Sequence, residues 1–231
     1  MYRPEINLHL GDCMTAMAEM PDKCFDLALV DPPYGINAPN MTMGSMPSRG
    51  EISTANRLKR LNGGSGKLKD RILNKSEIKW DYEKPSEKYF NELKRVSKNR
   101  IIFGGNYFDL GPSRCIICWD KIQPWDNFSQ WEMAWTSFDS PASLFKCANF
   151  DHNKIHPTQK PVALYRWLLD NYAKPGDRIL DTHGGSMSIA IACHDLGFDL
   201  ELYEIDEDYF KAGADRLKRH QAQGRLFDVQ P

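Results

Sequence analysis

The sequence predicts an α/β fold, with a mostly parallel sheet covered by helices on both faces, and three observations support this prediction. Short apolar runs at residues 25–30, 100–103 and 178–180 have the length of strands buried on both faces. Stretches with helical periodicity lie between such runs, as in βαβ units. At 231 residues, of which 41% are hydrophobic, the chain can bury one substantial core. We therefore expect residues 1–231 to form a single domain.

The N-terminal segment is expected to form a βαβ unit. It contains a strand, a brief helix and a second strand, over residues 6–10, 14–20 and 25–30. The crossover of such a unit is right-handed by strong default, and the carboxyl ends of its parallel strands share one edge of the sheet. Asp12 and Asp31, which follow the two strands, should therefore lie on that edge. Asp12 is equally well placed to cap the helix that follows it.

The remaining elements are predicted from periodicity and from start and stop signals. Residues 86–97 form an amphipathic helix, because their apolar side chains recur on one helical face. Further strands are expected at 100–103, 116–117, 131–136, 178–180 and 201–203, and further helices at 162–172, 187–196 and 207–221. Residues 137–155 are expected to be loops.

Charge and targeting signals exclude some classes of protein. The formal net charge is −1, so the chain is not a globally basic nucleic-acid binder, and contact with nucleic acid needs a local basic patch. No apolar run approaches the length of a transmembrane helix and the N-terminus lacks the features of a signal peptide, so we expect a cytoplasmic protein. No metal site is expected, because Cys115 and Cys118 lie three apart in a strand-like run and face opposite sides.

Asp31-Pro32-Pro33-Tyr34 forms the corner at the end of the strand at residues 25–30. The two prolines stop the strand and stiffen the turn. A carboxylate, rigid carbonyls and an aromatic ring suit a planar group with an exocyclic amine. The amine can donate to Asp31 and to the Pro32 carbonyl while the ring stacks on Tyr34. The alternative interpretation is a structural Pro-Pro turn with a satisfied aspartate and a packed tyrosine.

Residues 35–79 form an insertion without periodicity, rich in Gly, Ser, Asn and Pro, whose second half is basic. A charge run of this kind is most often a solvated face. Here it directly follows the Asp31 corner, where a phosphate backbone would have to lie, so we favour contact with nucleic acid. The candidate DNA-binding residues are Arg57, Lys59, Arg60, Lys67, Lys69 and Arg71. Residues 120–155 form a second candidate recognition region.

The last third of the chain predicts an adenosine-binding βαβ unit. A strand ending at Asp181 is followed by the turn Gly184-Gly185-Ser186, a helix, and a strand ending at Glu204. Glycines allow close approach of the backbone, and an acid about twenty residues further on can accept hydrogen bonds from ribose hydroxyls. The turn lacks the full dinucleotide fingerprint. An acid such as Asp181 suits an amino group near the turn.

These motifs and their order resemble the β-class amino-group DNA methyltransferases, which methylate adenine N6 or cytosine N4. The resemblance is carried by Gly11-Asp12, Asp31-Pro-Pro-Tyr34, His156-Pro-Thr-Gln-Lys-Pro161, Asp181 to Ser188 and Glu204-Ile-Asp206. In that class the catalytic half precedes the cofactor half, as it does here. The resemblance implies a circularly permuted Rossmann-like fold, S-adenosylmethionine as the cofactor, and double-stranded DNA as the partner.

The resemblance also implies roles for individual residues. Those that bind the target amine are Asp31, Pro32, Pro33 and Tyr34; those near the cofactor are Asp12 at the adenine, Glu204 at the ribose, Asp181, Gly185 and Ser186 at the methionine end, and Lys160 from the flanking motif. The target base would leave the duplex to reach the pocket under Tyr34. Adenine N6 is the expected target, because aspartate at the first motif position goes mostly with adenine. The family also makes a homodimer a reasonable expectation, whereas a companion restriction enzyme is not detectable in the sequence.

The glycine turn departs from the family pattern Asp-Pro-Phe-x-Gly-Ser-Gly-Thr. This chain reads Asp181-Thr-His-Gly-Gly-Ser-Met-Ser188, so that Met187 replaces the second glycine of the pattern. We interpret the turn as a tolerated variant of the family pattern: a side chain at Met187 is able to restrict the approach of the cofactor, while Gly184 restores some freedom to the turn. We interpret His183 as a half-buried residue that fills the space of the phenylalanine.

Other functions remain open at this stage. They are cytosine-N4 methylation, N-methylation of RNA or of a protein amide, and DNA binding by a relative that has lost its cofactor. The order of the motifs and the basic insertion speak against RNA or protein as the substrate. The altered glycine turn is the feature that would favour a binding protein without a cofactor.

Overall fold

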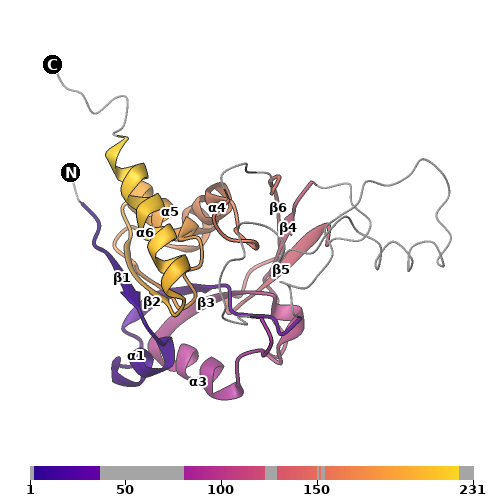
Figure 1. The fold of residues 1–231 in the computed structure, drawn as a ribbon. Helices are drawn as coiled ribbons and strands as arrows, with labels where there is room; N and C mark the ends of the chain where they lie inside the picture. Colours follow the sequence, from indigo (N-terminus) through magenta and orange to yellow (C-terminus); the bar gives the residue numbers. More distant parts are fainter. Residues whose placement is uncertain (1–2, 37–80, 123–128, 150, 152–153, 224–231) are drawn as a thin grey trace.

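An eight-stranded sheet runs through the part of the chain that the computed structural model describes, which is residues 3–36, 81–122, 129–149, 151 and 154–223 (Figure 1). The strands are β1 (Ile6–Leu10), β2 (Phe25–Val30), β3 (Ser97–Phe103), β4 (Ile116–Asp120), β5 (Trp131–Thr136), β6 (Ser143–Lys146), β7 (Arg178–Asp181) and β8 (Asp199–Glu204). Their order in the sheet is β1-β8-β7-β2-β3-β5-β4-β6. Only the pairings of β5 with β3 and with β4 are antiparallel among the described strands. The expected α/β fold with a mostly parallel sheet is therefore confirmed.

Helices cover both faces of this sheet. They are α1 (Cys13–Glu19), α3 (Glu87–Val96), α4 (Val162–Tyr172), α5 (Ser188–Leu196) and α6 (Glu207–Ala222). Figure 1 shows α4, α5 and α6 on one side of the sheet and α1 and α3 on the other, and each set packs on its own hydrophobic cluster. The strand β2 serves both clusters, because Leu27 and Leu29 face one and Ala28 and Val30 face the other. This is why the run at residues 25–30 is apolar at nearly every position.

Strands β1 and β2 run parallel and end at the same edge of the sheet, as expected, with β8 and β7 between them. The structure differs from the sequence-based expectation in one place. Strand β6 lies within residues 137–155, which were expected to be loops. It is a four-residue edge strand whose positions alternate between half-buried and exposed, so its sequence carries little hydrophobic signal.

Two predictions concern regions that the structure does not describe in full. The six basic residues between Arg57 and Arg71 lie outside the described residues, so their contact with DNA stays a prediction. The region 120–155 is described in part, through β5 and β6. Among the described residues, no helix combines the length and the apolar character needed to cross a membrane.

Candidate active site

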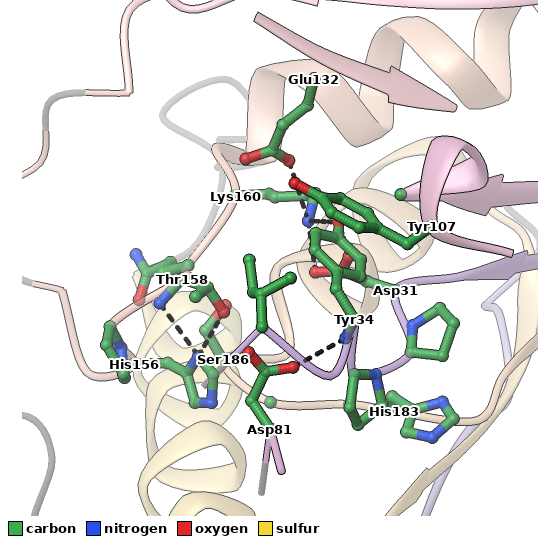
Figure 2. A pocket seen from close by; sticks show the side chains of 18 of the residues that line it. Asp31, Tyr34, Asp81, Tyr107, Glu132, His156, Thr158, Lys160, His183 and Ser186 are labelled. Atoms are coloured by element: carbon green, nitrogen blue, oxygen red, sulfur yellow. Dashed lines mark hydrogen bonds and ion pairs between the residues drawn. The ribbon is translucent and has the colours of Figure 1, made fainter. Parts of the chain in front are cut away.

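The corner after β2 is held in place by a carboxylate that lies 46 residues further along the chain than Gly35. Asp81 accepts hydrogen bonds from the backbone N–H groups of Tyr34 (2.7 Å) and Gly35 (2.9 Å), as Figure 2 shows for Tyr34. Asp81 is itself buried. Because the two prolines before Tyr34 have no N–H to donate, these two bonds are what fixes the exit of the turn.

The ring of Tyr34 has little freedom in this corner. Its hydroxyl donates to Asp31 Oδ1 (2.6 Å), and the ring stacks on Tyr107 with centroids 5.0 Å apart. Gly104, at the end of β3, has φ +70°, and a Cβ atom added there would lie 2.2 Å from the Tyr34 ring. Gly104 therefore has to be glycine for two reasons, the left-handed backbone and the contact with the ring.

Lys160 brings a positive charge to the Asp31 carboxylate. It lies just before α4, its side chain is only 3% exposed, and its Nζ forms an ion pair with Asp31 Oδ2 (Figure 2). The same Nζ lies 3.3 Å from Glu132 Oε2 on β5, and Glu132 Oε1 pairs with Lys121. Two carboxylates and two ammonium groups thus alternate at the corner with balanced charge, which is the condition for burying such groups.

Burial and neighbouring charges act together on the ionisation of Asp31, Glu132 and Lys160. Burial raises the pKa of Asp31 above its ordinary value, and Lys160 opposes that shift. Burial also opposes the charge of Glu132, but Lys160 and Lys121 outweigh burial and hold the pKa of Glu132 at about 2. Burial disfavours the Lys160 ammonium, yet Asp31 and Glu132 raise its pKa above the ordinary value. Lys160 is therefore charged at neutral pH.

The second corner of the site follows β7 and β8 and is held by backbone amides. Glu204 accepts from the N–H of Gly185 (2.6 Å) and from the N–H of Asp206 (2.9 Å). Gly184 donates to the carbonyl of Tyr203 (2.8 Å), so the glycine turn is tied directly to the end of β8. Glu204 is 9% exposed, and burial raises its pKa. This arrangement presents a fixed acid at the end of a strand, as the sequence predicts.

Met187 does not line the cavity, so its side chain does not narrow the space beside the glycine turn. The residue has φ +55° at the start of α5, and its side chain is fully buried in the core. It packs against α6 at Gly213, where an added Cβ atom would lie 2.6 Å from Met187 Cγ. A glycine on α6 therefore makes room for the methionine, and the turn keeps its cavity face open.

His183 fills a half-buried position beside the glycine turn. Its ring meets Tyr89 edge to face at 5.4 Å, and its Nδ1 lies 2.9 Å from Thr182 Oγ1. Burial lowers the pKa of His183 to about 4, so the ring is neutral. Its backbone N–H donates to Asp181, whose pKa is raised to about 8 by burial and by the nearby acids. This agrees with the interpretation of His183 as a space-filling residue.

A single cavity of about 590 Å³ joins the two corners. Asp31, Tyr34 and Lys160 line it on one side, and Gly185, Ser186 and Glu204 line it on the other. Figure 2 shows Ser186 and His183 facing the same space as Tyr34 and Asp31. A volume of this size suits a nucleoside-sized ligand together with part of a second molecule.

The predicted site residues divide into two groups. The residues that line the cavity are Asp31, Pro32, Pro33, Tyr34, Lys160, Gly185, Ser186 and Glu204. Asp12 and Asp181 do not line it. Asp12 caps α1 by accepting from the N–H of Met14 (2.9 Å), and Asp181 is buried behind the turn with 2% exposure. The proposed cofactor contacts of Asp12 and Asp181 stay predictions.

Sequence reasoning missed several residues of the site, namely Asp81, Tyr107, Lys121 and Glu132. The tyrosine belongs to the Gly-Gly-Asn-Tyr turn after β3, a glycine-rich strand end that could have flagged it. Glu132 lies in an apolar-rich strand, where a charged residue next to tryptophan and methionine was a usable signal. Asp81 and Lys121 carry no such local signal.

The fold and the two-cornered cavity define an α/β protein whose sequence and fold are similar to those of known methyltransferases. Residues 119–215 match the DNA methylase family of N6 and N4 methyltransferases. The DNA adenine methyltransferase YhdJ of Escherichia coli is 21% identical over 241 residues, covering 90% of this chain and 81% of that protein. The putative methylase YubD of E. coli is 34% identical over 68 residues, 29% of this chain and 30% of that protein. These matches support the assignment that the sequence motifs indicate, an amino-group DNA methyltransferase.

Solved structures of similar fold extend over nearly the whole chain. The M1.HpyAVI–SAM complex has a TM-score of 0.55 at 15% identity, covering 91% of this chain and 99% of that one. TTHA0409 of Thermus thermophilus, a putative DNA modification methylase complexed with S-adenosyl-L-methionine, has a TM-score of 0.56 at 13% identity, covering 93% of each chain. The cytosine-N4-specific PvuII DNA methyltransferase has a TM-score of 0.55 at 13% identity, covering 96% of this chain and 95% of that one. These likenesses confirm the expected methyltransferase fold.

Proposed function

We propose that this protein transfers a methyl group from S-adenosylmethionine to adenine N6 of a flipped-out base in double-stranded DNA. The observation that carries the proposal is the single cavity that Asp31 and Tyr34 share with Gly185 and Glu204. Two substrates that react with each other have to meet in one space, within about 3–3.5 Å of one another. Relatives and neighbours named as DNA methyltransferases, two of them complexed with this cofactor, support the same assignment.

The glycine-turn side of the cavity suits the adenosyl cofactor. Glu204 offers an acceptor for ribose hydroxyls, and the glycine turn lets the ligand approach the backbone. Two histidines line this part of the cavity, and both are neutral. Burial lowers the pKa of His156 to about 3 and that of His183 to about 4. A sulfonium cation therefore meets acids and neutral rings here, without imidazolium charges to repel it.

The Asp-Pro-Pro-Tyr side suits the target amine. Asp31 and the Pro32 carbonyl would accept its two N–H groups, and the base would lie against Tyr34. Hydrogen bonds of this kind favour a pyramidal nitrogen whose lone pair points at the methyl group. The nitrogen then forms the new bond to carbon, sulfur keeps the electron pair of the broken bond, and Asp31 is positioned to receive the proton that nitrogen releases.

Adenine is favoured over cytosine by two observations. The first motif position is aspartate, which goes mostly with adenine in the family that the sequence resembles. The relative YhdJ is named as an adenine enzyme. Cytosine N4 is the second candidate, because the PvuII enzyme has a similar fold and is named as cytosine-N4-specific.

The proposed function is tested with labelled S-adenosylmethionine and duplex DNA, followed by mass spectrometry of the nucleosides. We expect the wild-type chain to produce N6-methyldeoxyadenosine. The rate of Asp31→Ala should be lower by about 100-fold or more. Cofactor binding, measured by calorimetry, should be the same in both. Asp139→Ala is the control, since Asp139 is an exposed acid outside the cavity that forms an ion pair with Arg114.

Each other outcome of this experiment has a definite reading. N4-methyldeoxycytidine as the product would replace adenine by cytosine as the target. Labelled RNA or protein in place of DNA would overturn the substrate class. Equal rates from the wild type and Asp31→Ala would refute the role given to Asp31. No binding of the cofactor to the wild-type chain would refute the enzyme assignment altogether.

A further inference from the structure

Both oxygens of the proposed catalytic carboxylate are occupied. Asp31 Oδ1 accepts from the Tyr34 hydroxyl, and Oδ2 carries the ion pair with Lys160. Lys160 lies between Asp31 and Glu132, as Figure 2 shows, and no cofactor contact is needed to explain its position. Lys160 and Glu132 come from separate elements, the segment before α4 and the strand β5, so their meeting at Asp31 is a product of the tertiary fold.

An incoming amine changes the balance at this carboxylate. The amine brings N–H donors that need electron density on Asp31, and a cation bound to the same group withdraws it. Glu132 offers an alternative partner, because its Oε2 already lies 3.3 Å from Lys160 Nζ. Lys121 pairs with the other oxygen of Glu132, so the charges stay balanced wherever Lys160 rests. A small movement of the ammonium group thus frees Asp31 without leaving a buried charge unpaired.

We propose that Lys160 and Glu132 are positioning residues for Asp31. Lys160 keeps Asp31 ionised while the cavity holds no base, and Glu132 takes over Lys160 when the target amine binds Asp31. This inference rests on the proposed function and deepens it, because it assigns the step that converts Asp31 from an ion-pair partner into the acceptor of the amine. Lys160 then acts through Asp31, in place of the cofactor contact that the family resemblance implies.

Titratable groups from several elements surround Asp31. Tyr34 in the same turn, Glu132 on β5 and Lys160 before α4 act on its ionisation directly. The charge of Asp31 in turn affects Tyr89 on α3, Tyr165 on α4 and Asp181 at the end of β7, and Lys121 after β4 acts on Glu132. Burial raises the pKa of each tyrosine well above its ordinary value, so these three groups stay neutral. Lys160 and Glu132 are therefore the charged neighbours whose removal should shift the pKa of Asp31 in opposite directions. Lys160 lowers this pKa and Glu132 raises it.

The test combines two measurements on the full chain. The first is the titration of aspartate carboxyl groups by ¹³C NMR, with the Asp31 signal assigned from Asp31→Asn. The second is the pH dependence of kcat and of kcat/KM for DNA methylation. Lys160→Met keeps the length of the side chain and removes its charge. Glu132→Gln removes the second partner of Lys160 with little change in shape, and Glu132→Asp keeps the charge.

We expect Lys160→Met to raise the pKa of Asp31 by about one unit or more. The acid limb of the pH profile of kcat/KM should move to higher pH by the same amount. Glu132→Gln should lower the pKa of Asp31 and reduce kcat about tenfold, because Asp31 is then the one carboxylate that pairs with Lys160, while the KM for the cofactor stays unchanged. Glu132→Asp should restore part of kcat. In the double variant Lys160→Met/Glu132→Gln, the pKa of Asp31 should return toward its wild-type value.

A purely structural ion pair would behave differently. Lower thermal stability in both variants, with the Asp31 titration and the acid limb of the pH profile unmoved, would overturn the inference. If Lys160→Met does not fold, Glu132→Gln decides alone, and an unchanged kcat together with an unmoved Asp31 titration would overturn it. The NMR titration needs no activity, so a chain that methylates no DNA would refute the proposed function and still report on Asp31, Lys160 and Glu132.

Discussion

The two corners of the cavity are fixed by different kinds of interaction. At the corner after β2, charged side chains hold one another, and Asp31 and Lys160 are 129 residues apart in sequence. At the corner after β7 and β8, backbone amides hold carboxylates, and Gly185 and Glu204 are only 19 residues apart. The first corner is assembled by the tertiary fold, whereas the second is built almost entirely within one βαβ unit.

This difference suggests a division of labour. Backbone amides cannot rotate away from Glu204 without unfolding the turn, so the corner after β7 and β8 is fixed before any ligand binds. The side chains of Lys160 and Glu132 have several rotatable bonds and can exchange partners around Asp31. We expect changes at the first corner to affect the rate of methyl transfer, and changes at the second to affect cofactor affinity and stability.

The largest effect is expected from displacing Tyr34. Gly104→Ala would place a Cβ atom 2.2 Å from the Tyr34 ring, so the ring must move off the site where the base would stack. We expect the rate of methyl transfer to fall about 100-fold, with cofactor affinity unchanged in calorimetry. The matched control is Gly111→Ala, which has a similar φ of +72° but no atom within 4 Å of the added Cβ. Equal losses in both variants would show that backbone strain alone is responsible.

A second prediction concerns Glu204, the acid at the corner after β7 and β8. Glu204→Gln keeps the shape of the side chain but loses the charge that accepts from Gly185, from Asp206 and, in our proposal, from the ribose. We expect the cofactor Kd to rise about 10-fold to 100-fold, which corresponds to about 1.5–3 kcal/mol for hydrogen bonds to a charged group. At saturating cofactor, kcat should change far less. Glu201→Gln, on the same strand but outside the cavity, should leave the Kd unchanged, and a rise there would contradict a local effect.

A third prediction tests how the altered glycine turn is accommodated. Gly213→Ala would bring a Cβ atom within 2.6 Å of Met187 Cγ. We expect this overpacking to lower the free energy of unfolding by about 1–3 kcal/mol and to weaken cofactor binding. Adding Met187→Ala should recover part of the loss, giving a coupling of about 1 kcal/mol in a double-mutant cycle. Simple additivity of the two changes would mean that Met187 and Gly213 do not share this space.

The smallest effect is a change in pH dependence at Asp181. The folded-state pKa of Asp181 is raised to about 8, so its contribution to stability is full below the unfolded pKa near 4 and is lost as the pH rises toward 8. Asp181→Asn cannot titrate. Relative to this variant, the wild-type chain should lose about 1 kcal/mol of stability per pH unit between pH 5 and 7 in urea unfolding. If the free energy of unfolding depended on pH in the same way in the wild-type chain and in Asp181→Asn, a buried, largely protonated Asp181 would be contradicted.

The corner after β7 and β8 was more predictable from the sequence than the corner after β2, for the same physical reason. Glu204 and the glycine turn interact within one local unit, so their spacing in the sequence reflects their spacing in the structure. Glu132 reaches Lys160 only because β5 lies antiparallel between β3 and β4, and no local pattern encodes that strand order. The packing of Met187 could not be read from the sequence for a related reason, since it depends on a glycine of another helix, Gly213 on α6.

The central claim is that one cavity brings the methyl donor and the target amine together. A bisubstrate ligand, adenine joined through N6 by a short linker to the 5′ carbon of adenosine, tests it without knowledge of the recognition sequence. We predict that it binds the wild-type chain at least about 100-fold more tightly than adenosine does, and that Asp31→Ala removes this gain. An affinity no higher than that of adenosine, unaffected by Asp31→Ala, would contradict the claim.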